Sequence, residues 1–395
     1  MKKSLGFFCP ENYLYLNDKK FIEFNGVKLK TDYLLSLIHE ILIKFQLDDD
    51  DVELNDFTVN LYSKILRDRY GVHYKWYVDY LKEIGFIRMK SDYFVGKKSK
   101  TYVLNWFDFE RIRRVQVYDN ILLKNTCKEF HRKLNSNSPI SLDIRKRLVE
   151  DLNYVKIDFD KSMQLVNDLK NKSLITIGKY FKNFHSIMNI KENNIYFVFD
   201  EWGRCHTNFT VLKKEIRKNY LTIDDEPVDE IDIKNSQPFF LSKILMREMD
   251  LTDPEVKMFV DLVDKGLFYD YFISKFPKFF ASVNPQENRI QSKKMIYKVL
   301  FGFNGVKSEQ GRMFRELFPK IFTYIIKIKK EKNDYKYFSH TLMRMESDFL
   351  FGKVVTDIYK QIKGIKLFTV HDSITYPSKY KERVEKIFYE HLKKC

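Results

Sequence analysis

The alternation of apolar and polar residues predicts an N-terminal region of helices followed by a β-hairpin. Apolar positions recur every three or four residues over 31–45, 57–71 and 74–87, as they do on one face of a helix. Gly85 is a typical stop for the last of these helices. Over 86–106, apolar and polar residues alternate on both sides of the sequence GKKSK, which predicts two paired strands.

Two helices and a basic hairpin in this order are typical of a winged helix, predicted here at about 52–105 within an N-terminal region 1–105. In such a module the second helix enters a groove of DNA. Lys97, Lys98 and Lys100 occupy the hairpin tip, where their charges would meet phosphates. A small α/β packing module whose lysine-rich tip faces solvent is the alternative interpretation.

The segment 106–190 is basic and mainly helical in pattern. Apolar residues with helical spacing over 117–134, 139–157 and 161–173 predict three helices. We expect a connector or a reduced thumb here, between the N-terminal region and a C-terminal region 191–395. No internal repeat or low-complexity linker marks its two boundaries.

The net charge of the chain indicates a polyanionic partner. The chain has 70 Lys and Arg residues against 54 Asp and Glu, a net charge of +16. Such an excess repels itself unless a polyanion neutralises it, and nucleic acid is the commonest polyanion partner. Codon bias in an AT-rich genome is the alternative explanation, because Lys, Asn, Ile and Phe are all abundant.

The cysteines imply neither a disulfide framework nor a zinc site. Cys9, Cys127, Cys205 and Cys395 are far apart, with no C-x-x-C pair and no histidine at zinc spacing. The N-terminus lacks the pattern of a secretory signal, and no run of about 18 apolar residues occurs. We therefore expect a protein of the reducing cytoplasm without a membrane partner.

Two acids interrupt apolar, strand-like segments in the C-terminal region. LFTVHDSITY places Asp372 within an apolar run, and VDEIDI carries Asp232 near its end. Burying an ionised carboxylate costs several kcal/mol unless a metal ion or a cation compensates it. If the strands pair, the acids could bind two divalent cations about 3.5–4 Å apart, which is the arrangement for in-line phosphoryl transfer.

A nucleoside triphosphate would need further positive charge away from the metals. The segment ENRIQSKKMIYKVLFGFNG places Arg289, Lys293, Tyr297 and Phe301 on one helix face, and Gly302 ends the helix. The two cations could hold phosphate oxygens, and the two rings offer flat surfaces for a base. A solvated helix face and ordinary core aromatics are the alternative interpretations.

These segments resemble a known family. D-x-x-x-S from Asp232, R-x₃-K-x₃-Y-x₃-F-G from Arg289 and H-D-S from His371 are similar to motifs A, B and C of family A DNA polymerases. The related single-subunit phage and mitochondrial RNA polymerases share these motifs. DEWGRCHT, which contains Arg204, is similar to the element that precedes motif A in both groups. The resemblance covers roughly 195–380 and implies an α+β fold with a right-hand palm and fingers.

The resemblance also implies a role for each matching residue. Asp232, Asp372 and the backbone carbonyl of Ile233 would bind two Mg²⁺ ions, for which Mn²⁺ is expected to substitute. Arg289 and Lys293 would hold the triphosphate, and Lys293 would protonate the leaving pyrophosphate. The remaining implied contacts are Tyr297, Phe301, Gly302 and Phe239 with the nucleotide, and His371, Gln237 and Arg204 with primer, template or duplex backbone.

Several of these residues also have purely structural interpretations. The alternatives are turn-capping acids for Asp232 and Asp372, a core histidine for His371 and a turn anchor for Arg204.

The sequence departs from the family pattern at the positions that would contact the sugar of the nucleotide. DNA polymerases usually carry D-x-S-Q-x-E in motif A, where the Glu excludes a ribose 2′-hydroxyl, whereas this chain has DIKNSQPFF with Phe239 in that place. The related RNA polymerases usually have Tyr where this chain has Phe301. The choice of sugar stays open, with a preference for dNTPs because two apolar rings cannot satisfy a buried hydroxyl.

No stretch has the paired acids of a 3′ to 5′ exonuclease, so proofreading is not expected. With so short a thumb, processivity would require a processivity or replication partner. We predict a template-directed nucleotidyltransferase, with a preference for a DNA-directed DNA polymerase of a mobile element. Its expected partners are a DNA template and primer and nucleoside triphosphates, with RNA as an alternative.

The alternatives are a primase or RNA polymerase of the same superfamily, template-independent addition, and a non-catalytic DNA-binding replication initiator. A nuclease or phosphodiesterase is disfavoured because hydrolysis does not need the Arg289 and Lys293 helix.

Overall fold

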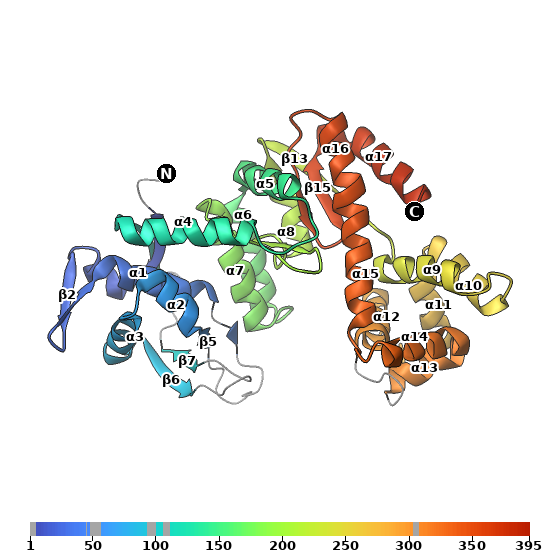
Figure 1. Cartoon of the computed structure of the whole chain (residues 1–395), viewed down its shortest axis with the longest axis horizontal. Helices are drawn as coiled ribbons and strands as arrows, with labels where there is room; N and C mark the ends of the chain where they lie inside the picture. The colour runs from blue at the N-terminus through green and yellow to red at the C-terminus, as the bar shows by residue number, and fades with distance from the viewer. Residues whose placement is uncertain (1–4, 45, 48–56, 93–99, 106–110, 303–307) are drawn as a thin grey trace. The chain divides into compact units, whose positions relative to one another are not determined.

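A computed structural model describes residues 5–44, 46–47, 57–92, 100–105, 111–302 and 308–395 (Figure 1). The chain forms two compact units. The first contains Met1–Lys133, Phe159–Asn194 and Val211–Lys213. The second contains Leu134–Asp158, Ile195–Thr210 and Lys214–Cys395.

The described residues of the first unit combine helices with three small antiparallel sheets. Their strand orders are β1-β8, β2-β3 and β4-β5-β7-β6. The elements are β1 (Leu5–Pro10), η1 (Glu11–Leu16), β2 (Phe21–Phe24), β3 (Val27–Lys30), α1 (Thr31–Lys44), β4 (Gln46–Leu47), β5 (Phe57–Leu61), α2 (Ser63–Tyr70), α3 (Tyr74–Glu83), β6 (Ile87–Ser91), β7 (Lys100–Leu104), β8 (Ile112–Val117), α4 (Asn120–Leu134), α6 (Phe159–Asn171) and α7 (Ile177–Lys191).

Helix α1 is the core of this unit. The periodicity predicts an amphipathic helix, but α1 is buried on all sides from Tyr33 to Leu42. Such a helix must satisfy its polar groups internally. His39 Nδ1 accepts a hydrogen bond of 3.0 Å from the backbone N–H of Phe8, and Glu40 pairs with Arg69 of α2 at 2.6 Å.

The structure corrects the prediction of a single helix over 57–71. The first five residues form strand β5, and α2 begins only at Ser63. Phe57, Val59 and Leu61 are buried in alternation, and β5 pairs with β7 in the register Thr58 to Val103. The apolar spacing fits both periods, so the hydrogen bonds available from β7 decide the outcome.

The second unit is built around one antiparallel sheet of order β14-β15-β13-β12-β9. Its strands and short helices are η3 (Leu152–Tyr154), β9 (Val155–Ile157), β10 (Phe197–Phe199), β11 (Cys205–Thr207), β12 (Leu221–Ile223), β13 (Glu226–Asp232), β14 (Phe368–Val370), β15 (Ser373–Pro377) and η5 (Ser378–Tyr380). Its longer helices are α5 (Leu142–Asp151), α8 (Lys214–Asn219), α9 (Ser236–Glu248), α10 (Pro254–Asp264), α11 (Phe268–Lys275), α12 (Pro285–Phe301), α13 (Glu309–Leu317), α14 (Pro319–Glu331), α15 (Tyr337–Ser347), the π-helix η4 (Asp348–Val355), α16 (Thr356–Gln361) and α17 (Lys381–Lys393).

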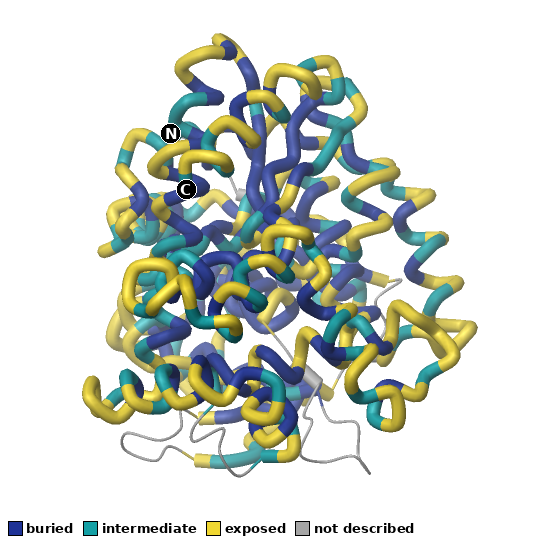
Figure 2. Tube along the Cα trace, turned by 90° about the vertical axis from the view of Figure 1, so that its right-hand side faces the viewer, coloured by how far each residue is buried: buried dark blue, intermediate teal, exposed yellow. Residues whose placement is uncertain are grey.

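The sheet is deeply buried at the end that carries β14 and β15. Both strands are buried at every position, whereas buried and exposed residues alternate along many of the helices (Figure 2). Phe209, which follows β11, stacks on Phe368 of β14 with ring centroids 4.2 Å apart. The β10–β11 hairpin thus packs against the edge strand β14.

The segment 106–190 contributes to both units. The three predicted helices correspond to α4, α5 and α6, but α5 ends at Asp151 rather than continuing to 157. Val155 begins strand β9, which pairs with β12 in the second unit. Here again strand pairing overrides a helical pattern.

Candidate functional site

Strand pairing brings the two strand acids to one edge of the sheet. β13 pairs with β15 so that Asp232 lies opposite Ser373, and Ser373 also lies opposite Val370 of β14. The turn between β14 and β15 consists of His371 and Asp372, with His371 at φ 56°. Asp232 therefore lies beside the turn that carries Asp372.

The two acids differ in their surroundings. The side chain of Asp232 is 51% exposed, and Lys214 Nζ of α8 lies 3.6 Å from its carboxylate. Burial, followed by the negative charges of Glu346 and Asp232, raises the pKa of Asp372 to about 7. The positive charge of Lys293 lowers the pKa of Asp372, but by less than burial and the neighbouring acids raise it. The site is thus rich in negative charge around Asp372.

Helix α12 presents the predicted cationic face. Asn284 caps the helix by accepting a hydrogen bond of 3.0 Å from the backbone N–H of Gln286. Arg289 and Lys293 lie over the ring of Tyr269, at 5.9 Å and 5.7 Å from its centroid. Arg289 Nη1 also contacts both carboxylate oxygens of Asp270, at 2.8 Å and 2.9 Å. This cation is held at the surface and would have to exchange partners to bind a phosphate.

The aromatic residues of α12 form a stacked pair. The rings of Tyr297 and Phe301 lie 5.3 Å apart and nearly parallel, at 15°. Tyr297 is 40% exposed. Desolvation and the charges of Asp372 and Glu346 raise the pKa of Tyr297 above its usual value. The aromatic end of this face thus lies within electrostatic reach of the acids.

The C-terminal end of α12 is fixed by a buried lysine that the sequence patterns missed. Lys329 of α14 donates to the carbonyl oxygens of Val299 at 2.9 Å and Gly302 at 3.1 Å. Burial lowers the pKa of Lys329 to about 8. A Cβ at Gly302 would lie 2.4 Å from the Lys298 carbonyl oxygen, so only glycine fits there.

The hairpin of β10 and β11 positions Arg204. In its turn, Asp200 Oδ1 accepts hydrogen bonds from the backbone N–H groups of Trp202 at 3.0 Å and Arg204 at 2.8 Å. Gly203 has φ 86°, and a Cβ there would lie 2.1 Å from Ser347 Oγ at the end of α15. Close contact between this turn and α15 therefore requires glycine.

A third carboxylate, Glu346 of α15, was not found by sequence reasoning. It is 4% exposed and accepts hydrogen bonds from Ser236 Oγ at 2.6 Å and Gln237 Nε2 at 2.7 Å. Arg204 Nη2 lies 3.8 Å from its other oxygen. The available signal was an acid within the apolar segment LMRMESDFLF, the same signal that marked Asp372.

The remaining predicted residues lie in varied settings. Desolvation and the charges of Arg204, His206 and Arg217 lower the pKa of His371 to about 4. Phe239 is 7% exposed inside α9, with Lys243 Nζ 4.7 Å from its ring centroid. The other positions are Ile233, buried directly after β13, Lys100, exposed and 3.1 Å from Asp92, and Lys97 and Lys98, outside the described residues.

The acid pair fits magnesium better than a metal that needs a complete protein cage. Among the described residues, no group of three or more His, Cys, Asp or Glu side chains is arranged to hold a metal ion. Mg²⁺ is usually bound by one or two carboxylates together with substrate phosphates and water. Asp232 and Asp372 supply such hard oxygen ligands, and no ion pair of the described residues neutralises Asp372 itself, whereas Lys214 lies 3.6 Å from Asp232.

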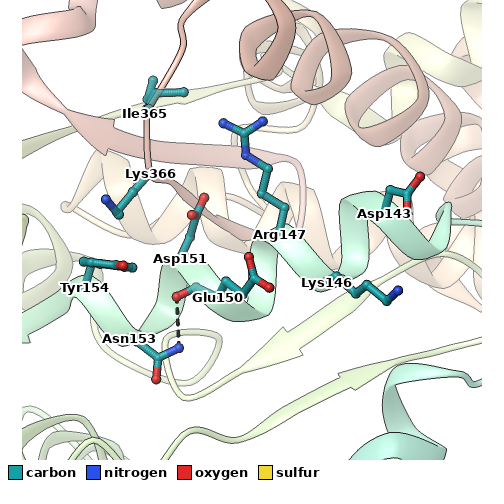
Figure 3. Close-up of a pocket in the computed structure, with 10 residues that line it drawn as sticks. Asp143, Lys146, Arg147, Glu150, Asp151, Asn153, Tyr154, Ile365 and Lys366 are labelled. Atoms are coloured by element: carbon teal, nitrogen blue, oxygen red, sulfur yellow. Dashed lines mark hydrogen bonds between the residues drawn. The ribbon is translucent and has the colours of Figure 1, made fainter.

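A cavity of about 520 Å³ lies elsewhere in the second unit, between α5 and the chain at 364–366 (Figure 3). Arg147 stacks on the ring of Tyr359 at 3.8 Å. Asp151 Oδ2 accepts hydrogen bonds from the Tyr359 hydroxyl at 2.6 Å and the backbone N–H of Leu367 at 3.0 Å. None of the predicted site residues lines this cavity.

Comparison with known proteins assigns no family. No family model and no curated protein matches the chain. Among matching solved structures is the polymerase domain of Pol1 from M. smegmatis in complex with DNA primer-template and dNTP. It shares 12% sequence identity over 69% of each chain, with a TM-score of 0.39. A TM-score this low does not establish a common fold, so the functional argument rests on the site.

None of the helices in the described residues has the length and apolar character needed to cross a bilayer.

Proposed function

We propose that this chain is a template-directed nucleic-acid polymerase that adds nucleotides to a primer. The observation that carries the proposal is the β13–β15 register, which places Asp232 beside the turn that bears Asp372. The exposed face of α12 supplies Lys293 and Tyr297 within electrostatic reach of Asp372. Acids and a cationic, aromatic helix face together suit nucleotidyl transfer better than hydrolysis.

Different residues would bind the metal ions and donate the proton in the proposed reaction. A primer 3′-hydroxyl would lose its proton to water as its oxygen forms a bond to the α-phosphorus, while the bond from that phosphorus to the leaving pyrophosphate breaks. When bound, two Mg²⁺ ions would activate the hydroxyl and neutralise the phosphates. Asp232, the Ile233 carbonyl and Asp372 would hold them, and Lys293 would donate a proton to the pyrophosphate.

The substrate would be oriented by α12. Arg289 and Lys293 would bind the β- and γ-phosphates, which requires Arg289 to leave Asp270. A triphosphate carries more charge than one carboxylate and can compete for the guanidinium. The stacked rings of Tyr297 and Phe301 would face the base, and Arg204 and His371 would contact the nucleic acid.

The sugar preference belongs to the same proposal. Phe239 is buried within α9, and Phe301 has no hydroxyl. A ribose 2′-hydroxyl would gain nothing from either ring and would lose its water. We therefore favour dNTPs, and a DNA-directed DNA polymerase of a mobile element, without an exonuclease.

The N-terminal unit would bind DNA. Within 57–104 the element order β5, α2, α3, β6 and β7 places two helices before a hairpin, which supports a winged helix at about 52–105. In such a module α3 would enter the groove, and Lys75 is exposed on it. Lys75→Glu is expected to weaken DNA binding measured by anisotropy and to reduce its salt dependence. An unchanged salt slope would contradict this role.

Primer extension tests the proposed function directly. The purified chain is incubated with Mg²⁺, a primed DNA template and either dNTPs or NTPs, with Asp372→Asn in parallel, and products are resolved on a gel. Extension with dNTPs that disappears in the variant is expected. Extension only with NTPs would indicate an RNA polymerase or primase, and no product from either set would favour a non-catalytic replication initiator.

A further inference from the structure

A buried carboxylate joins three separate segments of the acid site. The Glu346 cluster consists of Glu346 on α15, Ser236 and Gln237 at the start of α9, Asn235 just before α9, and Arg204 in the β10–β11 turn. One oxygen of Glu346 accepts the hydrogen bonds of Ser236 and Gln237, at 2.6 Å and 2.7 Å. Its other oxygen faces Arg204 Nη2 at 3.8 Å. Both oxygens therefore face donors.

The Glu346 cluster forms hydrogen bonds to the chain segment that follows Asp232. Only three residues separate Asp232 from Ser236, the first residue of α9. Asn235 has φ 55°, a left-handed conformation that asparagine adopts more readily than most residues, and its side chain does not cap α9. The hydrogen bonds of Ser236 and Gln237 to Glu346 hold the first turn of α9, where this connection ends.

The opposite side of the cluster is also closely packed. The Arg204 turn approaches Ser347 so closely that Gly203 cannot carry a Cβ. Directly after Ser347 the helix widens into the π-helical segment η4, and Figure 1 shows α15 continuing into α16 along one helical path. Wide helical turns of this kind are frequent at functional sites.

Several polar atoms of the Glu346 cluster form no hydrogen bond to the described residues. Arg204 Nε, Asn235 Nδ2 and Gln237 Oε1 are buried and have no hydrogen-bond partner among the described residues. A buried polar atom without a partner loses its hydrogen bonds to water without replacement, so such atoms are uncommon unless function requires them. Their grouping around Glu346 distinguishes this acid from one that only stabilises the fold.

We propose that Glu346 is a positioning residue for nucleotide addition, an inference that rests on the proposed polymerase function. Its carboxylate holds the start of α9 and orients the Arg204 guanidinium, and thereby sets the position of Asp232 relative to the bound primer. Glu346 itself does not contact the phosphates. Loss of its charge should therefore lower kcat much more than it raises the KM for the nucleotide.

The decisive variant is Glu346→Gln, with Asp151→Asn as a matched control. A Gln has one oxygen, so its amide group must face either Arg204 or the Ser236 and Gln237 pair. Asp151 is another buried acid of the same unit, but a single oxygen accepts both of its hydrogen bonds, which an Asn oxygen can also do. The control thus loses a buried charge without losing contacts.

We expect Glu346→Gln to lower kcat about 10- to 100-fold, because small misplacements at a reacting centre have effects of this size. KM for dNTP should change less than about threefold, and Asp151→Asn should keep wild-type kcat. In a double-mutant cycle with Arg204→Gln, the two losses should be strongly non-additive, because both variants break one contact. Thermal unfolding curves give the folded fraction of each variant at the assay temperature.

Each other outcome contradicts either this inference or the proposed function, and the two can be told apart. Wild-type kcat for folded Glu346→Gln, or activity lost only in proportion to folded protein, overturns the positioning role. If Glu346→Gln does not fold, Ser236→Ala replaces it and should lower kcat at least threefold, and wild-type kcat in that variant also overturns the role. No extension by the wild-type chain would instead refute the polymerase function.

Discussion

Acids shielded from solvent occur in both units, but the charges around Glu129 and around Asp372 differ. In the first unit, Arg69 contacts both Glu40 and Glu129. Although burial opposes it, the charge of Arg69 lowers the pKa of Glu129 to about 2. In the second unit, burial and neighbouring acids raise the pKa of Asp372 to about 7. No cation among the described residues forms an ion pair with Asp372.

The difference separates carboxylates that stabilise the fold from those that serve a site. An acid with close cations favours folding, whereas an acid surrounded by like charges opposes it and persists where function requires it. Burial alone does not make this distinction, because burial by itself raises the pKa of both Glu129 and Asp372. The distinguishing feature is the balance of charge around each group.

Removal of divalent metal should have the largest effect, because it removes the charge that would compensate Asp232 and Asp372. With EDTA in place of Mg²⁺, primer extension should fall to background, and excess Mn²⁺ should restore it. DNA binding measured by anisotropy should change little. Full extension in EDTA would show that these acids do not hold a catalytic metal.

Asp372→Asn should separate activity from stability. We expect kcat to fall at least about 10³-fold, while the free energy of unfolding stays the same or rises, because an uncompensated charge is removed. Extension assays and urea unfolding measure the two quantities. The control Asp151→Asn should keep activity, and a clearly destabilised Asp372→Asn would argue that Asp372 is a structural acid after all.

Lys293→Ala should lower kcat/KM for the nucleotide about 10²-fold, because one cation for the triphosphate is lost. Lys294→Ala is the matched control, since Lys294 is the exposed neighbour on the same helix and lies outside the predicted face. Steady-state kinetics on primed DNA measure both. Equal effects of the two substitutions would point to general electrostatic attraction of the substrate.

Glu129→Gln should have the smallest effect and the opposite pattern. It should lower the free energy of unfolding at pH 7 by about 1–3 kcal/mol, because Arg69 loses a charged partner, and leave kcat unchanged. A folded-state pKa below the unfolded value of 4.5 means that this stability is present above pH 4.5 and lost as the pH falls towards 2. The free energy of unfolding of the wild type and of Glu129→Gln should therefore be measured at several pH values. If the pairing were unimportant, the difference between the two proteins would be the same at every pH.

Much of the fold was predictable where the pattern is local. The face of α12 follows from residues four apart, and the helix ends at Phe301 before Gly302 as its sequence predicts. The stretch 57–71 was not predictable in the same way, because FTVNL fits a strand and a helix equally well and only the pairing of β5 with β7 decides between them.

The sequence by itself determined which segments carry acids in apolar surroundings and which helix face carries cations and rings, because these are properties of neighbouring residues. Only the tertiary structure decided that Asp232 lies beside the Asp372 turn and that Glu346 joins Arg204 to Ser236 and Gln237. Such contacts depend on strand register and helix packing between residues far apart in the chain. Local periodicity contains no information about either.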